Sequence, residues 1–538
     1  MNDSLTADCY PVTQARGLNR LFVDFCAANE TARAFYGVSQ TEFASPTRPP
    51  VPDHWPELVR LLKAQNPSLS AAAAIEALAQ GAGTVVTGQQ VGLFGGPLFT
   101  PFKAATAVAR ARQATRAGHP HAAIFWLATE DHDFEEINHV TFPARHMLAK
   151  LTYATAPHSP VPVGKVVLDD SITPLVDRAW ELLGFSEAME ALATAWQPGR
   201  TFAQAFASFY SRIFAAQGLL VLDAASRDFH RLGAPVLRAA IERADELHAA
   251  LLDRNRALEA AGYHAQVAVT PQSSLLFLID AETGVRQALR RTAPTAEEPD
   301  GLWHAGRRTL TTADLTGILD AEPERISPSA LLRPVFQDFL LSTTSLIGGP
   351  AEIAYFAQSA VLYERILGRQ TPPAPRLSAT LIEPAIGELL RRHELTLGRV
   401  LDEDAASLGK LLAARALPIE GKRKLAAAGN ALDTELAFLL DWTSSLDQGL
   451  ARSAEISARK MRYQMNRLRN LAANFQIKRE ESLARHAESI AQSLYPGGVM
   501  QERVHGAAYY FARYGLDLAE SLCVQAENPC PGHMALWL

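Results

Sequence analysis

Short apolar runs alternate with longer helix-forming stretches along the first 384 residues of the chain. Residues 84–87 form a β-branched run, residues 99–116 contain good helix formers without an internal glycine, and residues 122–129 form a continuous apolar run. A continuous apolar run is typical of a strand that is buried on both faces. The order strand, helix, strand therefore predicts a βαβ unit, with a parallel sheet and a right-handed crossover.

The same alternation recurs twice farther along the chain. Residues 202–261 predict a helix, a strand at 218–223 and then one or two further helices. Residues 329–367 predict one helix before and one helix after a strand at 342–347. Alternation on this scale favours an α/β fold with a doubly wound parallel sheet.

Two stretches interrupt this pattern. Residues 140–200 are rich in proline and predict a small inserted unit, whereas residues 264–326 alternate with a period of two and predict a β-rich second insertion. The core is therefore expected to consist of residues 1–139, 201–263 and 327–384.

The pattern changes after Pro384. Residues 385–494 contain one proline, Pro418, which separates two long helical stretches. Apolar residues recur there at alternating three- and four-residue steps, with Thr443 filling one step: Leu432, Leu436, Leu439, Leu446, Leu450, and then Leu468, Leu471 and Phe475. This spacing predicts an antiparallel helical hairpin or coiled coil, through which we expect a homodimer. Residues 495–538 return to mixed sequence and are expected to pack on the core.

Composition narrows the class of protein. Of the 538 residues, 48% are hydrophobic and 20% are charged, which excludes a disordered or collagen-like chain. The net charge of −6 argues against a protein whose main task is to coat nucleic acid. No apolar run approaches the ~20 residues that span a bilayer, and residues 1–20 lack the apolar block of a signal peptide. The cysteines make no disulfide framework, so we expect a reduced, soluble, cytoplasmic enzyme. They are Cys9, Cys26, Cys523 and Cys530.

A glycine-rich turn follows the strand predicted at 84–87, at the edge where open α/β sheets bind ligands. Glycines let backbone N–H groups approach an anion, and the start of the next helix adds the positive end of its dipole. The turn fits neither the Walker loop nor the dinucleotide-binding fingerprint, and a tight turn that merely requires glycine is the alternative. The expected ligand contacts are Gly88, Gln89, Gln90, Gly92 and Lys103.

An acidic cluster with one imidazole begins where the strand at 122–129 ends, and consists of Glu130, Asp131, His132 and Asp133. Carboxylates this close repel one another unless the cluster binds a cation or an amine, or transfers protons. The alternatives are an acid-rich helix start and a metal site completed by a ligand such as His139. We expect active-site residues and no bound metal.

A second glycine turn follows the strand predicted at 342–347, and a helix follows that turn. An arginine fork here would hold a carboxylate, and Glu352 would hold an amine. An ordinary crossover with a polar helix face is the alternative. The polar residues and glycines of this region are Arg333, Gln337, Gly348, Gly349, Glu352, Tyr355 and Gln358.

The strings at 87–103 (TGQQVGLFGGPLFTPFK), 125–138 (FWLATEDHDFEEIN) and 327–358 resemble the bacillithiol biosynthesis cysteine-adding enzymes, the BshC family, over nearly the whole chain. The resemblance implies a Rossmann-like core with two inserted connecting segments and a C-terminal coiled coil used in dimerisation. It also implies a cytoplasmic ligase that joins cysteine, through its carboxyl group, to the amine of glucosaminyl malate. One departure is Gly95, where the family often has threonine.

Such a reaction requires activation of a carboxylate, for which ATP is the candidate co-substrate. The resemblance carries over no catalytic residue, so roles rest on the motifs. The expected catalytic residues are Asp131, His132, Asp133 and Glu352. Substrate or nucleotide binding is expected from Glu130, Arg333, Gln337, Gly348, Gly349, Tyr355 and Gln358, together with the first glycine turn.

Two other functions compete with this interpretation. A metal-dependent hydrolase would use residues 130–133 around a divalent ion, and an RNA-binding protein would use the locally basic helical arm. Nucleic acid is the less favoured partner, since a basic helix is more often a solvated face or an oligomer contact. Cys523, Cys530 and His533 suggest a zinc site that lacks a fourth ligand.

Overall fold

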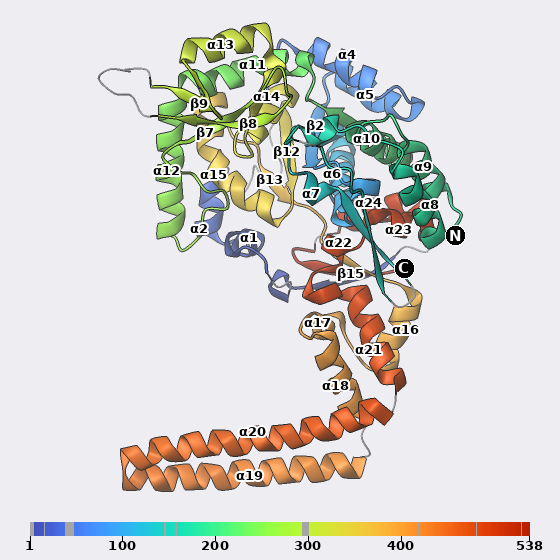
Figure 1. Cartoon of the computed structure of the whole chain (residues 1–538), viewed down its shortest axis with the longest axis vertical. Coiled ribbons are helices and arrows are strands. Elements are labelled where there is room, and N and C mark those ends of the chain that lie inside the picture. Colours follow the sequence, from blue (N-terminus) through green and yellow to red (C-terminus); the bar gives the residue numbers. More distant parts are fainter. Residues whose placement is uncertain are drawn as a thin grey trace. The chain divides into compact units, whose positions relative to one another are not determined.

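The computed structural model describes residues 5–14, 17–37, 48–144, 147–157, 159–292, 301–416, 419–479, 481–528 and 530–538. The chain divides into two compact units (Figure 1). The first comprises Met1–Thr380 with Glu502–Leu536, and the second comprises Leu381–Gln501 with Trp537–Leu538.

A five-stranded parallel sheet forms the centre of the first unit, in the order β13-β12-β2-β3-β6. Its strands are β2 (Gly83–Gln89), β3 (His121–Leu127), β6 (Leu220–Asp223), β12 (Thr343–Gly348) and β13 (Pro373–Pro375). The predicted α/β class is confirmed, and each of the four strands expected from apolar runs is present. Because all five strands are parallel, their carboxyl ends lie at one edge of the sheet.

Helices cover both faces of this sheet. On one face Phe125 of β3 packs edge-on against Phe206 and Tyr210 of α10 (Phe202–Ile213). On the other face Trp126 packs against Phe336 of α14 (Arg333–Leu341). Successive residues of a strand point to opposite faces, so the apolar run of β3 supplies both cores.

Among the remaining helices of the core segments, those at 99–116, 227–260 and 350–367 were predicted, and the helices before residue 80 and at 134–137 were not. Helix α6 begins at Phe99 and ends at Arg116, and α15 begins at Pro350 and ends at Leu367, as predicted. The others are α1 (Arg20–Cys26), α2 (Glu30–Arg33), α4 (Trp55–Gln65), α5 (Ala72–Ala79), α7 (Phe134–Ile137), α11 (Arg227–Glu242) and α12 (Ala244–Ala260).

The two interrupting stretches have their own small sheets. Residues 140–200 hold most of a hairpin, β4 (His139–Pro143) with β5 (Leu148–Thr152), followed by α8 (Ile172–Leu183) and α9 (Glu187–Ala195). The second stretch forms an antiparallel sheet in the order β10-β9-β8-β7-β11. Its elements are β7 (Ser273–Ile279), β8 (Arg286–Arg291), β9 (Trp303–Ala305), β10 (Arg308–Leu310), α13 (Thr312–Ala321) and β11 (Ile326–Pro328).

The turn between β2 and α6 explains the glycine at position 95. Phe94, Gly95 and Gly96 all have positive φ angles, of 51°, 89° and 71°. A Cβ atom on Gly95 would lie 2.5 Å from Cε1 of Phe209. The Gly95 carbonyl accepts a hydrogen bond from the Tyr210 hydroxyl at 2.8 Å. Threonine would be strained in both backbone and packing here, so this chain requires glycine.

The two ends of the first unit lie together, which corrects the expectation of unpaired cysteines. Strand β1 (Thr6–Tyr10) neighbours β15 (His533–Trp537), and a disulfide joins Cys9 to Cys530 with their Cα atoms 5.9 Å apart. The expectation was wrong because the number of cysteines in a chain says nothing about which of them folding brings together. Cys26 and Cys523 are free thiols.

The C-terminal segment 495–538 also contains α22 (Gln501–Val504), α23 (Ala507–Tyr514) and α24 (Leu518–Ala526). Within it, Glu502–Leu536 belongs to the first unit. Strand β14 (Ala379–Ile382) lies where the division between the two units falls.

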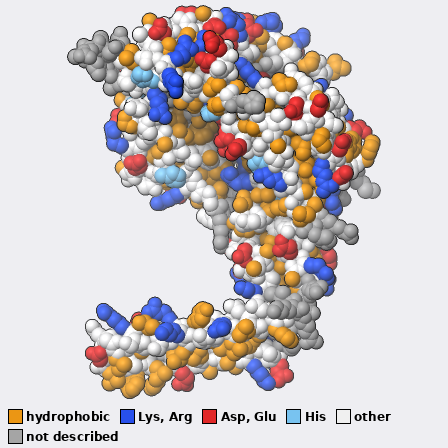
Figure 2. Space-filling view, in the orientation of Figure 1, with side chains coloured by type: hydrophobic (Ala, Val, Ile, Leu, Met, Phe, Trp, Pro, Cys, Tyr) orange, Lys and Arg blue, Asp and Glu red, His pale blue; other side chains and the backbone are white. Residues whose placement is uncertain are grey.

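The second unit is helical and contains the predicted hairpin, formed by α19 (Ile419–Leu446) and α20 (Gln448–Arg479) lying side by side (Figure 1). Leu436 and Thr443 of α19 and Ala458 of α20 are buried. Most of the predicted leucine stripe is instead exposed, including Leu439 and Leu446 (Figure 2). The hairpin was predicted correctly, but most of the predicted leucine stripe, apart from Leu436, is exposed.

The other helices of this unit are α16 (Pro384–Arg392), α17 (Leu397–Leu401), α18 (Ala405–Ala416) and α21 (Glu481–Leu494). Among the helices that the structure describes in either unit, none combines the length and the apolar character needed to cross a membrane.

Candidate functional site

Lys103 joins the two glycine turns at the carboxyl edge of the sheet. Its side chain projects from the first turns of α6 and is only 3% exposed. Nζ donates to the Gly88 carbonyl at 2.7 Å and to Oε1 of Gln89 at 2.8 Å, and forms an ion pair with Glu352. Burial lowers the pKa of Lys103, and the Glu352 carboxylate partly offsets this effect.

The start of α15 is fixed by Glu352. Its Oε2 accepts the backbone N–H of Gly349 at 2.8 Å, which satisfies one donor of the first helical turn. Next to Gly349 lies Arg376, whose guanidinium makes two hydrogen bonds to the buried carboxylate of Glu502, at 2.9 and 2.6 Å. Burial acts to raise the pKa of Glu502, but Arg376 outweighs it, and the net pKa is lowered. Gly348, the last residue of β12, accepts the N–H of Arg376 and is buried.

Arg333 is the first residue of α14 and lies over the first glycine turn. It donates to the Tyr355 hydroxyl at 2.7 Å and to Oε1 of Gln337 at 3.0 Å. A Cβ atom on Gly88 would lie 3.6 Å from Nη1 of Arg333, so the guanidinium passes close to the backbone of the turn. Burial raises the pKa of Tyr355 to about 12, although Arg333 opposes the shift, so this hydroxyl stays protonated.

Asp131 is held by the second glutamine of the first turn. Gln90 Nε2 donates to Oδ2 of Asp131 and to Oε2 of Glu136, both at 2.7 Å. Oδ1 of Asp131 accepts the backbone N–H of His132 at 2.7 Å. The turn after β2 and the acidic cluster after β3 are therefore parts of one site, as adjacent strand ends would place them.

Arg286 supplies the cation that faces this cluster. It lies in β8, stacks on the Phe277 ring with its guanidinium carbon 3.6 Å from the ring centroid, and donates to Ser327 Oγ at 3.0 Å. Its Nη1 lies 3.3 Å from Nδ1 of His132. Since a guanidinium only donates, Nδ1 is the acceptor, and a neutral His132 carries its hydrogen on Nε2. Burial lowers the pKa of Arg286, partly offset by Glu130 and Asp131.

Glu130 is engaged in the interior. Its Oε1 lies 2.9 Å from Nε2 of His230 in α11, while Nδ1 of His230 donates to the carbonyls of Pro323 and Ile326 at 3.1 and 3.0 Å. Burial acts to lower the pKa of His230, but Glu130 outweighs it, and the net pKa is raised. His230 therefore joins Glu130 to two carbonyls of the second insertion and holds that insertion against α11.

Three of the predicted site residues have contacts that stabilise the local structure. Asp133 is exposed and caps α7 by accepting the N–H of Glu136 at 3.3 Å. Gln358 is fully buried, accepts the N–H of Val267, and donates to Asn255 Oδ1 and to the Val267 carbonyl. Gly92 lies in the buried part of its turn.

A cavity of about 210 Å³ opens where these groups meet. Its polar and charged walls are Thr129, Glu130, Asp131, His132, Arg286, Ser329 and Arg333. A second cavity of about 440 Å³ shares Leu127, Thr129 and Ala225 with it and reaches Asp223 and Lys165. Thr129 donates to Asp223 Oδ1 at 2.6 Å, and burial raises the pKa of that carboxyl group, which the Thr129 hydrogen bond partly opposes. Together the cavities offer space along the ends of β3 and β6, with cations and carboxylates on the walls.

Comparison with known families places this geometry in context. Residues 5–377 match the family described as the N-terminal Rossmann-like domain of the bacillithiol biosynthesis protein BshC, and residues 379–536 match its C-terminal coiled-coil domain. The chain belongs to the BshC family.

Its relatives in this family match over most of their length. A Koribacter versatilis protein named "Putative cysteine ligase BshC" is 40% identical over 98% of this chain and 99% of its own. Proteins of the same name from Solibacter usitatus and Salinibacter ruber are 36% and 31% identical, over 90% and 81% of this chain and 90% and 80% of their own.

Sequence reasoning missed several residues of this BshC-family site. Arg286, His230 and Asp223 come from β8, from the interior of α11 and from the end of β6, and none stands in a motif. Only Asp223 carried a signal, because it ends the predicted strand at 218–223 at the ligand-binding edge. Arg286 reaches the site through packing of the second insertion, whereas His230 reaches Glu130 from α11 of the core.

The zinc and hydrolase alternatives lose their geometric support. Cys530 is in a disulfide, and the ring nitrogens of His533 lie 2.8 Å from the hydroxyls of Ser378 and Thr380. In the part of the chain that the structure describes, no three His, Cys, Asp or Glu side chains converge as a metal site. Residues 130–133 diverge instead, since Glu130, Asp131 and Asp133 each bind a different element.

Proposed function

We propose that this BshC-family chain forms the amide bond between the carboxyl group of cysteine and the glucosamine amine of glucosaminyl malate, the last step of bacillithiol biosynthesis. The observation that carries the proposal is the cavity in which Arg286 and Arg333 face Asp131 and His132. The printed names of its relatives, which call them cysteine ligases, support the same chemistry.

The walls suit these substrates. Glucosaminyl malate has two carboxylates and one amine, so two guanidiniums and one carboxylate match its charges. Asp131, which is partly exposed to the cavity, holds the amine and accepts its proton. Arg286 already donates to Nδ1 of His132, so that ring positions substrate as a donor through Nε2, rather than acting as the base. Glu352 is paired with Lys103 and shapes the turn, which leaves Asp131 as the better amine ligand.

Activation of the cysteine carboxyl group by ATP is part of this proposal. The glycine turn itself does not fit a phosphate cradle, since the N–H groups of Gly92, Gly95 and Gly96 all donate to carbonyls within the turn. No reaction step is therefore assigned to a nucleotide held there.

The test is to incubate the purified protein with glucosaminyl malate and cysteine, with and without ATP, and to measure products by mass spectrometry. We expect the amide with a free thiol, formed only when the activating nucleotide is present. Absence of this amide with any nucleoside triphosphate would refute the proposal.

We also propose a homodimer through the helical hairpin. Its exposed apolar stripe runs along both helices, and a stripe of this size is uncommon on a monomer (Figure 2). The stripe also argues against RNA as the main partner of the arm, because apolar side chains contribute nothing to phosphate binding. Its exposed members include Phe438, Leu439, Trp442, Leu446, Leu450, Leu468, Leu471 and Phe475.

A further inference from the structure

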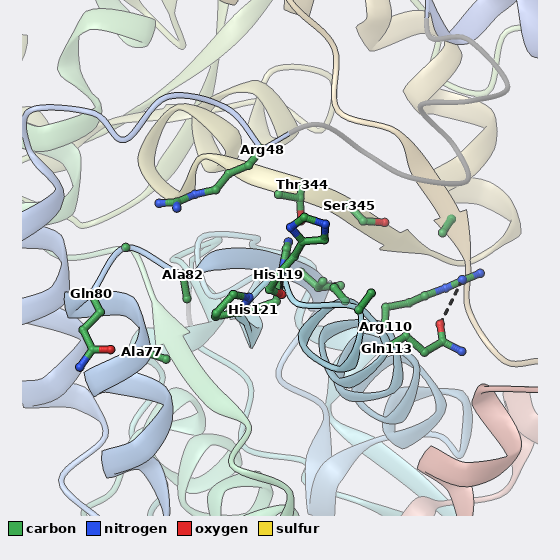
Figure 3. A pocket seen from close by; sticks show the side chains of 16 residues that line it. Arg48, Ala77, Gln80, Ala82, Arg110, Gln113, His119, His121, Thr344 and Ser345 are labelled. Carbon is green, nitrogen blue, oxygen red and sulfur yellow. Dashed lines mark hydrogen bonds between the residues drawn. The ribbon is translucent and has the colours of Figure 1, made fainter.

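A large groove lies at the opposite ends of β2, β3 and β12 from the candidate site. It has a volume of about 790 Å³, within the range of small-molecule sites. Its walls come from α5 and the turn after it, from the last turns of α6, and from His119 and Pro120 in the loop before β3 (Figure 3). No residue of the two cavities described above lines it.

Among the residues that the structure describes, the ionisable side chains on these walls are arginines and histidines: Arg48, Arg110, His119 and His121. Figure 3 shows the histidines in the middle of the groove, with Arg48 and Arg110 on different sides. Within the described ranges, neither arginine forms an ion pair with a carboxylate. Both arginines are exposed, so either water or a bound anion can offset their charges.

The electrostatic effect of this arrangement is visible in two groups. Partial burial lowers the pKa of Arg110, although the residue as a whole is exposed to solvent. Burial also lowers the pKa of His121, and the positive charges of Arg48 and His119 add to that effect, although a hydrogen bond to the His119 carbonyl opposes it. An anion bound beside these side chains would stabilise the charged form of each.

The remaining wall residues define the rest of the ligand. The Ser345 hydroxyl has no hydrogen-bond partner among the residues that the structure covers, whereas the neighbouring Thr344 hydroxyl donates to the Thr84 carbonyl at 2.8 Å. Ser345 can therefore bond to a ligand. The apolar part of the wall consists of Ala77, Ala82, Val85, Ala114, Ala117 and Ala374. Small apolar side chains leave room for a flat or branched hydrocarbon group.

We propose that this groove binds a small molecule that carries an oxyanion, either phosphate or carboxylate, next to an apolar portion. Guanidinium forks bind both kinds of oxyanion through paired N–H groups, and the two histidines and Ser345 supply further donors. The alanine-rich wall receives the apolar portion. This site is separate from the edge where we place amide formation, and the inference does not depend on the proposed ligase activity.

Isothermal titration calorimetry on the full chain tests the proposal, with inorganic phosphate and succinate as separate probes. At least one probe should bind. If only one of them binds, that probe identifies the oxyanion as phosphate or carboxylate. The double variant Arg48→Ala/Arg110→Ala should raise the Kd by about tenfold or more, and His119→Ala should raise it by a smaller factor. The control Arg307→Ala removes an exposed arginine outside the groove and should leave the Kd unchanged.

Three outcomes would overturn the proposal. The first is that neither probe binds up to about 10 mM. The second is that the double variant binds as tightly as the unchanged chain. The third is that binding disappears in Arg333→Ala and survives in Arg48→Ala/Arg110→Ala. The last result would place the anion at the candidate site instead. His119 lies in an exposed loop, so His119→Ala keeps the test decisive if circular dichroism shows the double variant misfolded.

Discussion

Individual residues at the carboxyl edge of the sheet act mainly by fixing one another. Lys103 shares a buried ion pair with Glu352 while also bonding to Gly88 and Gln89, so a single ammonium ties both glycine turns. Asp131, by contrast, is fixed by Gln90 and still lines a cavity. A group that is bonded on one side and open on the other can meet a substrate without rearrangement, which favours Asp131 over Glu352 as the reacting carboxylate.

The Lys103–Glu352 pair should reveal its role through stability. Lys103→Met leaves the Glu352 carboxylate without its buried partner, so the free energy of unfolding should fall by about 3 kcal/mol. The double variant Lys103→Met/Glu352→Gln should lose less than the sum of the two single variants, because no unpaired charge remains. Urea denaturation of the four proteins measures this coupling. Strictly additive losses would show that the two side chains do not interact.

The buried His533 predicts how stability depends on pH. Burial lowers its pKa to about 4, with Arg376 acting in the same direction and Glu502 opposing it. In the unfolded chain the same group takes a proton near pH 6.5, so acidification favours unfolding between about pH 6.5 and 4. Above pH 6.5 the group has no such effect.

The expected loss of unfolding free energy from His533 is roughly 1 kcal/mol per pH unit below 6.5. His533→Gln keeps hydrogen-bonding atoms toward Ser378 and Thr380 but does not titrate, so it should be less sensitive to pH in this window. Denaturation at pH 7.5 and 5.5 compares the two proteins. Equal losses in both would mean that His533 is not the responsible group.

At the scale of elements, four of the five core strands and the longer helices from α6 onward could be predicted, whereas β13, the helices before β2 and the pairing of distant segments could not. Helices α6 and α15 begin and end as predicted, because proline and glycine mark their ends. The glycine turns and Asp131 were found because parallel strand ends must share one edge. Arg286 could not be found, since the insertion that carries it packs without a local signal, and His230 could not be found because it lies inside a core helix with no motif around it. The disulfide between β1 and the tail was missed for the same reason.

The helical hairpin shows a different limit. The three- and four-residue spacing correctly predicted two helices, but spacing alone does not tell which apolar face meets which partner. Gly429, Leu436 and Thr443 of α19, seven residues apart, are the positions that are buried. The exposed leucines of the predicted stripe form a second surface on the hairpin.

That surface gives a prediction about assembly. Replacing Leu439 and Leu446 by glutamate places charges in the exposed stripe without touching the buried seam, so the dimer should become a monomer while helicity is kept. Light scattering at micromolar concentration and circular dichroism measure both. Arg459→Glu, a charge change on the exposed surface of α20, is the matched control and should remain dimeric. A monomeric mass for the unchanged chain would refute the dimer outright.

For the whole molecule, we place amide formation where four separate stretches of the chain meet. The turn after β2 contributes Gln90, the segment after β3 contributes Asp131 and His132, the second insertion contributes Arg286, and the start of α14 contributes Arg333. Insertions into a Rossmann-like sheet thus complete the site, and the core alone would lack the cation that faces His132.

The most direct test compares two neighbouring carboxylates in the product assay. Asp131→Asn should lower the rate of amide formation from cysteine and glucosaminyl malate by at least about 100-fold, since it removes the group that accepts the amine proton. Asp133→Asn keeps a good helix cap outside the cavity and should stay within about tenfold of the unchanged chain. Thermal unfolding checks that both variants are folded. Full activity in Asp131→Asn together with a dead but folded Asp133→Asn would contradict the placement of the site.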